Sequence, residues 1–185
     1  MTDQSGERRV LALDVHPRSF GFVVFEGPNR MLDWGVRSFR TGVNAVKISA
    51  ATKVLALLDE FRPSAVVVRE RLARKTAKQT KMLATMERQA RSRRIPVRHL
   101  SRPDVNRAFV GFERNKYEVA SALAQQFPAL ASRLPPRRKC WQSEDYRMGI
   151  FDAAAAGVAY FARRKPVTNG MDVPVSRNRR AELPT

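Results

Sequence analysis

The first forty residues alternate between apolar and polar positions in a way that predicts three consecutive strands. Residues 9–15 form an apolar run, and residues 19–25 form a second one after a short polar break. The turn sequence EGPN separates the second run from a third, residues 30–39. Alternate positions of the last two runs are expected to share one face of the sheet, namely Phe20, Phe22 and Val24, and then Leu32, Trp34 and Val36. We therefore expect an antiparallel meander.

Beyond the meander the apolar spacing changes to that of helices alternating with strands. We expect a helix over 45–61, a buried strand over 64–70, a helix over 71–94, a short strand over 95–100, and helices over 115–127 and 144–164. The last helix is rich in alanine, which predicts close packing on the sheet. The element order βββ-α-β-α-β-α-α predicts an α/β fold. It should hold a five-stranded mixed sheet, with the meander beside two parallel strands and helices on both faces.

The helix predicted over 71–94 carries only a thin apolar stripe. The residues expected to face inward are Leu72, Thr76, Leu83, Met86 and Ala90. After residue 165 the periodicity is lost and arginines recur, which is typical of a basic disordered tail over 165–185. We expect one folded domain over 9–164 and a disordered N-terminus over 1–8.

Composition adds a strong constraint on the partner. The chain has 185 residues, 43% of them hydrophobic, and a formal net charge of +18. A positive charge of this size predicts that the protein binds a polyanion. No apolar run has the length of a membrane span, the N-terminus lacks the apolar region of a secretion signal, and the single cysteine, Cys140, forms no internal disulfide or zinc cluster. We expect a cytoplasmic, nucleoid-associated protein with no membrane partner.

Three acidic residues interrupt apolar elements. Asp14 lies within the first predicted strand, Glu70 closes the fourth, and Asp152 lies in the apolar part of the last helix. Right-handed crossovers can place the fourth strand beside the first, so that these carboxylates converge. Converging carboxylates repel one another unless a cation lies between them, and oxygen ligands favour Mg²⁺ or Mn²⁺. The alternative is that each acid caps a backbone group or pairs with an arginine such as Arg69 or Arg147.

Four segments in this order resemble the RuvC-type Holliday-junction resolvases of the ribonuclease-H-like superfamily. They are LALDVHPRSFGFVVFEG with LDWGVRSF, AVVVRE, NKYEVASAL and FDAAAAGVAY, and the resemblance covers about residues 9–163. It implies a two-metal nuclease centre with Asp14, Glu70 and Asp152 as metal ligands. It also implies that Lys116, three residues before Val119, lies near the scissile phosphate.

One position departs from this family's pattern. RuvC-type resolvases usually carry an acid or histidine one helical turn before the last aspartate, where this chain has Gly149. Asp145 lies on the same helical face but seven residues before Asp152, which is about 10.5 Å along a helix. We expect the second metal to be held mainly by Asp14, Glu70 and DNA phosphate, and this puts full activity in doubt.

Basic and aromatic residues suggest where nucleic acid would bind. The helix over 71–94 presents a nearly uncompensated basic surface, and we expect Arg71, Arg74, Lys75, Lys78 and Lys81 to follow a DNA backbone. The alternative is an ordinary solvated helix face. Phe109 and Phe112, in a predicted loop, are candidates for insertion at a junction centre. Trp34 and Trp141 are candidates for base stacking. The alternative is a place in the core, which is the more usual one for a tryptophan in a meander such as Trp34.

Two functions from different classes follow. The first is a Mg²⁺-dependent, structure-selective endonuclease of branched DNA that acts as a homodimer, with Asp14, Glu70, Asp152 and Lys116 as its catalytic residues. The second, motivated by Gly149, is a nucleic-acid-binding protein of the same fold that cuts poorly or not at all. An actin-like phosphotransferase is disfavoured, because the first turn, DVHPRSFG, supplies only one glycine.

Overall fold

Five strands form one mixed sheet in the order β3-β2-β1-β4-β5. The computed structural model describes residues 8–39, 43–70, 76–111 and 115–164. The strands are β1 (Arg9–Val15), β2 (Ser19–Glu26), β3 (Met31–Ser38), β4 (Ala65–Arg69) and β5 (Val97–Leu100). β1, β2 and β3 pair antiparallel, whereas β4 is parallel to both β1 and β5. The predicted meander with two parallel strands is confirmed.

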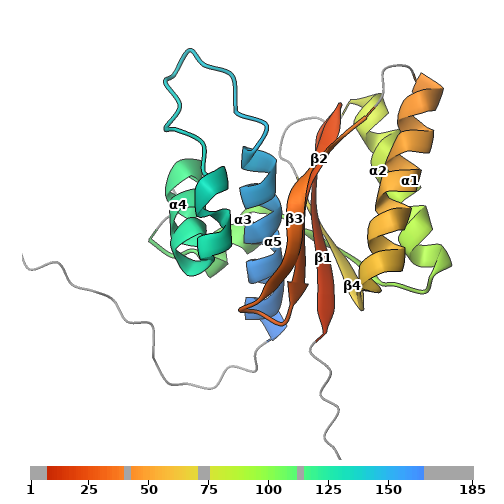
Figure 1. Cartoon of the computed structure of the whole chain (residues 1–185), viewed down its shortest axis with the longest axis horizontal. Coiled ribbons are helices and arrows are strands. Elements are labelled where there is room, and N and C mark those ends of the chain that lie inside the picture. The colour runs from red at the N-terminus through yellow and green to blue at the C-terminus, as the bar shows by residue number, and fades with distance from the viewer. Residues whose placement is uncertain (1–7, 40–42, 71–75, 112–114, 165–185) are drawn as a thin grey trace, which may run out of the picture.

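Helices cover both faces of the sheet (Figure 1). One face carries α1 (Val43–Phe61) and α2 (Ala77–Ser92), and the other carries α3 (Arg102–Ala108), α4 (Lys116–Gln126) and α5 (Met148–Arg164). Each face has its own apolar core, because the buried β-strands present alternate side chains to the two layers. No helix among the described residues has the length and apolar character that a bilayer span needs.

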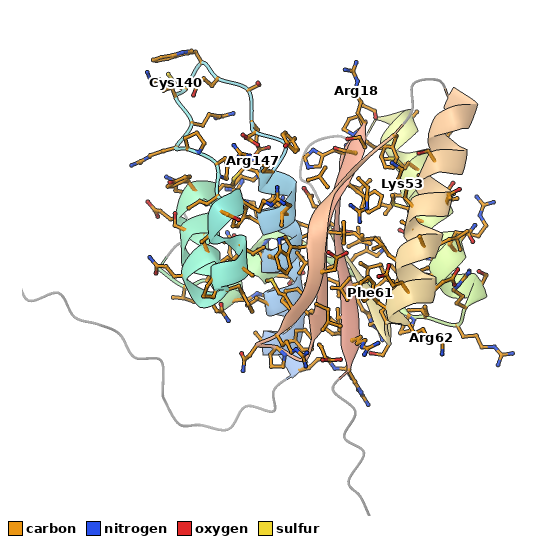
Figure 2. The ribbon with its side chains drawn as sticks, in the orientation of Figure 1. Arg18, Lys53, Phe61, Arg62, Cys140 and Arg147 are labelled. Carbon is orange, nitrogen blue, oxygen red and sulfur yellow. The ribbon has the colours of Figure 1, made fainter. Side chains whose placement is uncertain are left out.

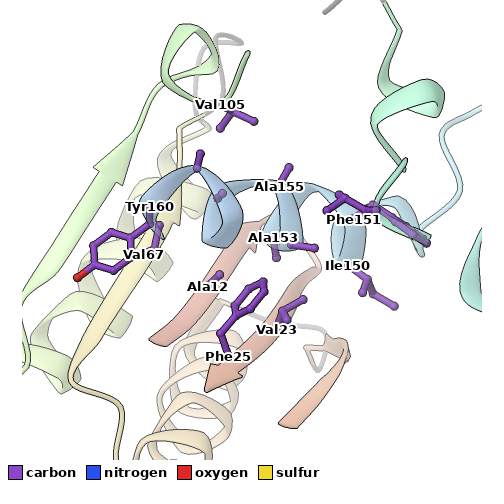
Figure 3. Close-up of a cluster of buried hydrophobic side chains, with 14 of the residues drawn as sticks. Ala12, Val23, Phe25, Val67, Val105, Ile150, Phe151, Ala153, Ala155 and Tyr160 are labelled. Atoms are coloured by element: carbon purple, nitrogen blue, oxygen red, sulfur yellow. The ribbon is translucent and has the colours of Figure 1, made fainter. Parts of the chain in front are cut away.

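Helix α5 lies directly on the strands, as its alanine content predicts. Residues 153–156 are four buried alanines; Ala153 points toward the sheet residues Ala12, Val23 and Phe25, whereas Ala155 lies on the opposite side of the helix, away from the strands (Figure 3). At Gly21 the approach is so close that a Cβ atom would lie 2.1 Å from the carbonyl oxygen of Gly149. Small residues at this crossing therefore set the distance between α5 and the first two strands.

The alternation predicted for the third strand is broken by a bulge. The pairing of β2 with β3 shifts between Val24 and Phe25, so that Val24 pairs with Asp33 but Phe25 with Met31. As a result Leu32 packs on the α1–α2 side, while Trp34 and Val36 pack on the α5 side. The expectation that these three side chains share one face is wrong, because one extra residue in a strand reverses the side on which later side chains lie.

Two short helices were not predicted from the sequence. They are α3 and the 3-10 helix η1 (Pro128–Arg133). The N-terminal signal of α3 is a capping box, in which the Ser101 hydroxyl accepts from the Asp104 N–H and Asp104 accepts from the Ser101 N–H. Because α3 is helical, Phe109 at its C-cap packs into the core and is only 7% exposed. Phe109 is therefore a core residue, and its burial does not support the predicted insertion at a junction centre.

The described part of the basic helix also differs in detail from its predicted inner stripe. Thr76 is the exposed N-cap of α2, where it closes a capping box with Gln79. Met82 is buried beside Leu83, Met86 and Ala90, so it joins the stripe that faces the sheet. The predictions for Leu72, for residues 1–7 and for residues 165–185 lie outside the described residues.

Candidate functional site: a carboxylate pair held by an arginine

Asp14 and Asp152 converge at the edge of the sheet where β1 and β4 end. Asp14 is the sixth residue of β1 and is fully buried, and Asp152 on α5 is 6% exposed. The nitrogen Nη1 of Arg69 lies 2.8 Å from Oδ2 of Asp152 and 3.7 Å from Oδ1 of Asp14. A single guanidinium nitrogen thus reaches both carboxylates, and the expected convergence of these two acids is present.

Arg69 occupies this position because of its register in β4. Leu13 of β1 pairs with Val68 of β4, so Arg69 comes next to Asp14 across the parallel pair. Ala65 and Val67 contribute to the core under α5, and Arg69 continues their alternation toward the same helix. Its side chain is only 11% exposed. An arginine in such a place is expected to be ion-paired, because an isolated buried charge is costly.

Glu70 does not join the two aspartates. It follows the last residue of β4, and its side chain is 45% exposed, with Oε1 3.6 Å from Nδ1 of His99. Val66 and Val68, which share its parity along the strand, pack on the α1–α2 side. The prediction that Glu70 meets the other acids is not supported here, because a difference of one residue reverses the side of the sheet to which a side chain points.

Two further side chains bind the aspartates. Lys116, the first residue of α4, donates from Nζ to Oδ2 of Asp152 at 2.7 Å and also contacts Glu144. His16, in the turn after β1, has Nε2 2.6 Å from Oδ2 of Asp14. His16 was not predicted as a site residue. The signal for it in the sequence is its position two residues after Asp14, where the chain turns back.

The electrostatics of Asp152 reflect this crowded environment. Burial raises its pKa above the ordinary range of an aspartate, and the neighbouring charge of Asp14 raises it further. Arg69 and Lys116 act in the opposite direction, because they stabilise the ionised carboxylate. The cations on Arg69 and Lys116 therefore offset part of the repulsion that a bound metal was expected to relieve.

The chain supplies no additional acid at the start of α5. Gly149 lies one turn before Asp152, where a Cβ atom would be 3.5 Å from Nε2 of His16. Asp145 is held by Arg147, which donates from Nε at 3.0 Å and from Nη2 at 2.7 Å, and this pairing lowers the pKa of Asp145. Of the three acids for which arginine pairing was the alternative, Asp14 and Asp152 pair with Arg69, whereas Arg147 pairs with Asp145 instead.

The residues at this site do not fit a two-metal centre. Among the described residues there is no group of three or more His, Cys, Asp or Glu side chains that could hold a metal ion. The two converging carboxylates already contact Arg69, and Asp152 also contacts Lys116. A divalent ion would have to displace the guanidinium and bind with only two protein carboxylates. The arrangement is a charge-compensated pair rather than a vacant cation site.

Two hollows lie beside the pair. A small cavity of about 30 Å³ is bounded by Arg69, Lys116 and Asp152 together with Arg102, Asn106 and Asn115, and it has room for about one or two waters. The larger, about 490 Å³, opens between the start of α4 and residues 135–148, with Arg137 and Arg138 among its lining residues. Arg102 and Asn106 were not predicted as site residues, because their segment was expected to be a loop, and Asn115 was expected only as the first residue of a helix.

Only part of the predicted nucleic-acid surface is described. Lys81 is exposed on α2, and so are Arg88 and Arg91 on the same helix. The predicted contacts at Arg71, Arg74, Lys75 and Phe112 and the side chain of Lys78 lie outside the described residues. Trp34 packs against the core under α5, as expected, whereas Trp141 is 75% exposed.

Solved structures show which fold this is. RuvC from Thermus thermophilus superposes with a TM-score of 0.64 and 22% identity, over 84% of this chain and 95% of that one. The same protein in complex with a Holliday junction substrate gives 0.64 and 20% over the same shares. The yeast mitochondrial Holliday junction resolvase gives 0.60 and 15%, over 84% of this chain and 78% of that one. The chain therefore has the ribonuclease-H-like fold of the RuvC-type resolvases.

The comparisons by sequence add no further relative. No protein-family model and no curated protein matches the chain.

Proposed function

We propose that this protein binds branched DNA on the fold of a junction resolvase and does not cut it with metal ions at the Asp14–Asp152 site. The observation that carries the proposal is the position of Arg69, whose guanidinium lies within 2.8 Å of Asp152 and 3.7 Å of Asp14. A two-metal nuclease needs that space for cations held by several carboxylates. Here the guanidinium of Arg69 occupies that space.

The choice of branched DNA as the ligand rests on the fold and on the charge. Two of the similar solved structures, those of Thermus thermophilus RuvC and of a fowlpox virus resolvase, contain Holliday junction DNA. The net charge of +18 fits a polyanionic partner. Arg18, labelled in Figure 2, and Lys81 on α2 are exposed. Arg18 lies in the turn that directly follows β1, and Asp14 is the last but one residue of β1, so Arg18 is at the same end of the sheet as the carboxylate pair. We place the DNA across this end of the sheet.

A binding assay with matched DNAs tests recognition. Mobility shifts would compare a four-way junction with a linear duplex of the same sequence and length, at several salt concentrations. We expect the junction to bind more tightly, and the affinity for both DNAs to fall steeply as salt rises. Equal affinity for junction and duplex would overturn the structural selectivity in this proposal.

A cleavage assay tests the second part. The wild-type protein and the Asp14→Asn variant would be incubated with the junction in Mg²⁺ or Mn²⁺, and the strands analysed under denaturing conditions. We expect intact strands with both proteins. Metal-dependent nicks that the variant no longer makes would overturn the proposal and assign the second candidate, a Mg²⁺-dependent endonuclease.

The endonuclease remains the alternative because Asp14 and Asp152 do converge on this fold. For cleavage, the Arg69 side chain would have to move away so that Mg²⁺ could bind between the two aspartates, while Lys116 would remain beside the DNA phosphate.

A homodimer is part of both candidate functions, since two symmetric copies match the symmetry of a four-way junction. Analytical ultracentrifugation of the protein with and without junction DNA would measure its oligomeric state directly.

A further inference from the structure

The connection between η1 and α5, residues 135–147, carries two highly exposed aromatic side chains to which the proposed function assigns no role. Trp141 is 75% exposed and Tyr146 is 69% exposed. Among the described residues, the only other large apolar side chain with such exposure is Val110. A single exposed aromatic residue is ordinary, so this connection needs a second property before it indicates a ligand.

That second property is its charge. Three consecutive exposed cations, Arg137, Arg138 and Lys139, precede the tryptophan. The ammonium of Lys139 lies 5.4 Å from the centre of the Trp141 ring. The acids of the same connection are already compensated, because Glu144 contacts Lys116 and Asp145 pairs with Arg147. The uncompensated charge beside the ring is therefore positive, which suits a phosphate backbone.

The connection is also held in a defined shape. The backbone N–H of Lys139 donates to the side-chain oxygen of Gln142 at 3.0 Å, and the N–H of Gln142 donates to the Lys139 carbonyl at 3.1 Å. Figure 2 shows Cys140 at the outer end of this connection, beyond α4 and α5, and Trp141 is the next residue along this turn. The contacts of Lys116 with Glu144 and Asp152 tie the returning segment to the carboxylate pair.

We propose that Trp141 stacks on an unpaired base of branched DNA while Arg137, Arg138 and Lys139 hold the adjoining phosphates. The inference rests on the proposed function, since it names the feature of the DNA that this part of the chain recognises. Aromatic rings stack on any base through its face, so the contact requires an unpaired nucleotide rather than a sequence. The cleft of about 490 Å³ lined by Arg137, Arg138 and Lys116 lies beside the carboxylate pair and would receive the strand that continues from this base.

Tryptophan fluorescence provides a direct test because the chain has only two tryptophans. In a Trp34→Phe variant, Trp141 is the sole tryptophan emitter. We expect its emission to be quenched when a junction with unpaired bases at its centre is added, and to change far less with a fully paired duplex. Circular dichroism would verify that the variant keeps its fold.

Binding measurements with Trp141 variants complete the test. Trp141→Ala should weaken binding to the DNA with unpaired bases by about fivefold or more, whereas Trp141→Phe should stay within about threefold of wild type, since it keeps an aromatic face. Val110→Ala, an equally exposed apolar residue elsewhere, is the matched control and should bind like wild type.

The outcomes separate this inference from the proposed function. If the wild type shifts the junction but Trp141 emission stays constant and Trp141→Ala binds as tightly as wild type, the stacking role is overturned and branched-DNA binding stands. If the wild type binds no branched DNA, both fall together. Both the stacking role and branched-DNA binding are supported if Trp141 emission is quenched and Trp141→Ala loses affinity only for DNA with unpaired bases.

Discussion

The guanidinium of Arg69 lies 2.8 Å from the carboxylate of Asp152, on the side of the sheet where a third acid was expected. Asp14 lies next to it across the strand pair β1–β4. The cation that neutralises the two acids is thus part of the chain. This relationship links the stability of the site to its chemistry.

Removing the arginine should destabilise the protein strongly. In Arg69→Gln the buried Asp14 and Asp152 lose their shared partner, and breaking a buried pair costs about 3–5 kcal/mol of unfolding free energy at neutral pH. The loss should shrink as the pH falls, because burial and Asp14 raise the pKa of Asp152 and protonation relieves the repulsion. Urea denaturation at pH 7 and pH 5 measures both effects.

Arg91→Gln is the matched control for that experiment. Arg91 also forms an ion pair, with Glu87, but its side chain is 68% exposed. Such surface pairs contribute about 0–1 kcal/mol. Equal losses in the two variants would mean that Arg69 does not neutralise a buried charge cluster.

Replacing the same arginine with an acid should create a metal site where the described residues form none. In Arg69→Glu three carboxylates would converge, so we expect Mn²⁺ to raise the melting temperature of this variant. A concentration 100 times the dissociation constant corresponds to about 2.7 kcal/mol of stabilisation. The melting temperatures of wild type and of Arg69→Gln should rise little when Mn²⁺ is added. A wild-type protein that Mn²⁺ stabilises as much as the variant would show that Arg69 does not block metal binding.

The crossing of α5 over β2 should be sensitive to one added methyl group at Gly21 but not at Gly149. A Cβ atom on Gly21 would lie 2.1 Å from the carbonyl oxygen of Gly149, so Gly21→Ala must push the helix away. On Gly149 the nearest atoms would be 3.5 Å away, an ordinary contact. We expect Gly21→Ala to lower the unfolding free energy by about 1–3 kcal/mol or more. Gly149→Ala should be neutral or stabilising.

Thermal denaturation of the two alanine variants checks this difference. Unfolding free energies close to that of wild type for both variants would indicate that the helix can shift at little cost. The same result would also remove the steric reason for a small residue at position 21.

The capping box of α3 should make a pH-dependent contribution to stability. Hydrogen bonds from the side chain and the backbone of Ser101 lower the pKa of Asp104, so this carboxylate favours the folded state when it is ionised. Its contribution is present above the ordinary aspartate pKa of about 4 and is lost as the pH falls further. We expect Asp104→Asn to cost about 1 kcal/mol at pH 7.

Denaturation of the Asp104→Asn variant from pH 7 to pH 3 is the corresponding measurement. The gap to wild type should close toward pH 3. Asp59→Asn is a suitable comparison, because Asp59 pairs with Arg93 at the surface and has a side chain that is 62% exposed. A gap for Asp104→Asn that stays constant with pH would exclude a charge-dependent cap.

Much of the fold follows from local patterns. The bounds predicted for β1 match those observed, and the other strands and the helices of more than ten residues agree within four positions, except that α2 begins at Ala77 and not at the predicted residue 71. The short helices α3 and η1 were missed, because six or seven residues are too few for a helical period to emerge. For α3 the capping box at Ser101 was nevertheless present in the sequence.

The sequence by itself determined the order of the elements, the excess of positive charge and the presence of Asp14 and Asp152 in apolar surroundings, because these depend on neighbours along the chain. Only the tertiary structure decided which side chain completes the pair. Arg69 and Glu70 are adjacent in sequence, yet one points toward α5 and the other away from it. Strand register, set by long-range pairing with β1, placed the cation rather than the acid between the two carboxylates.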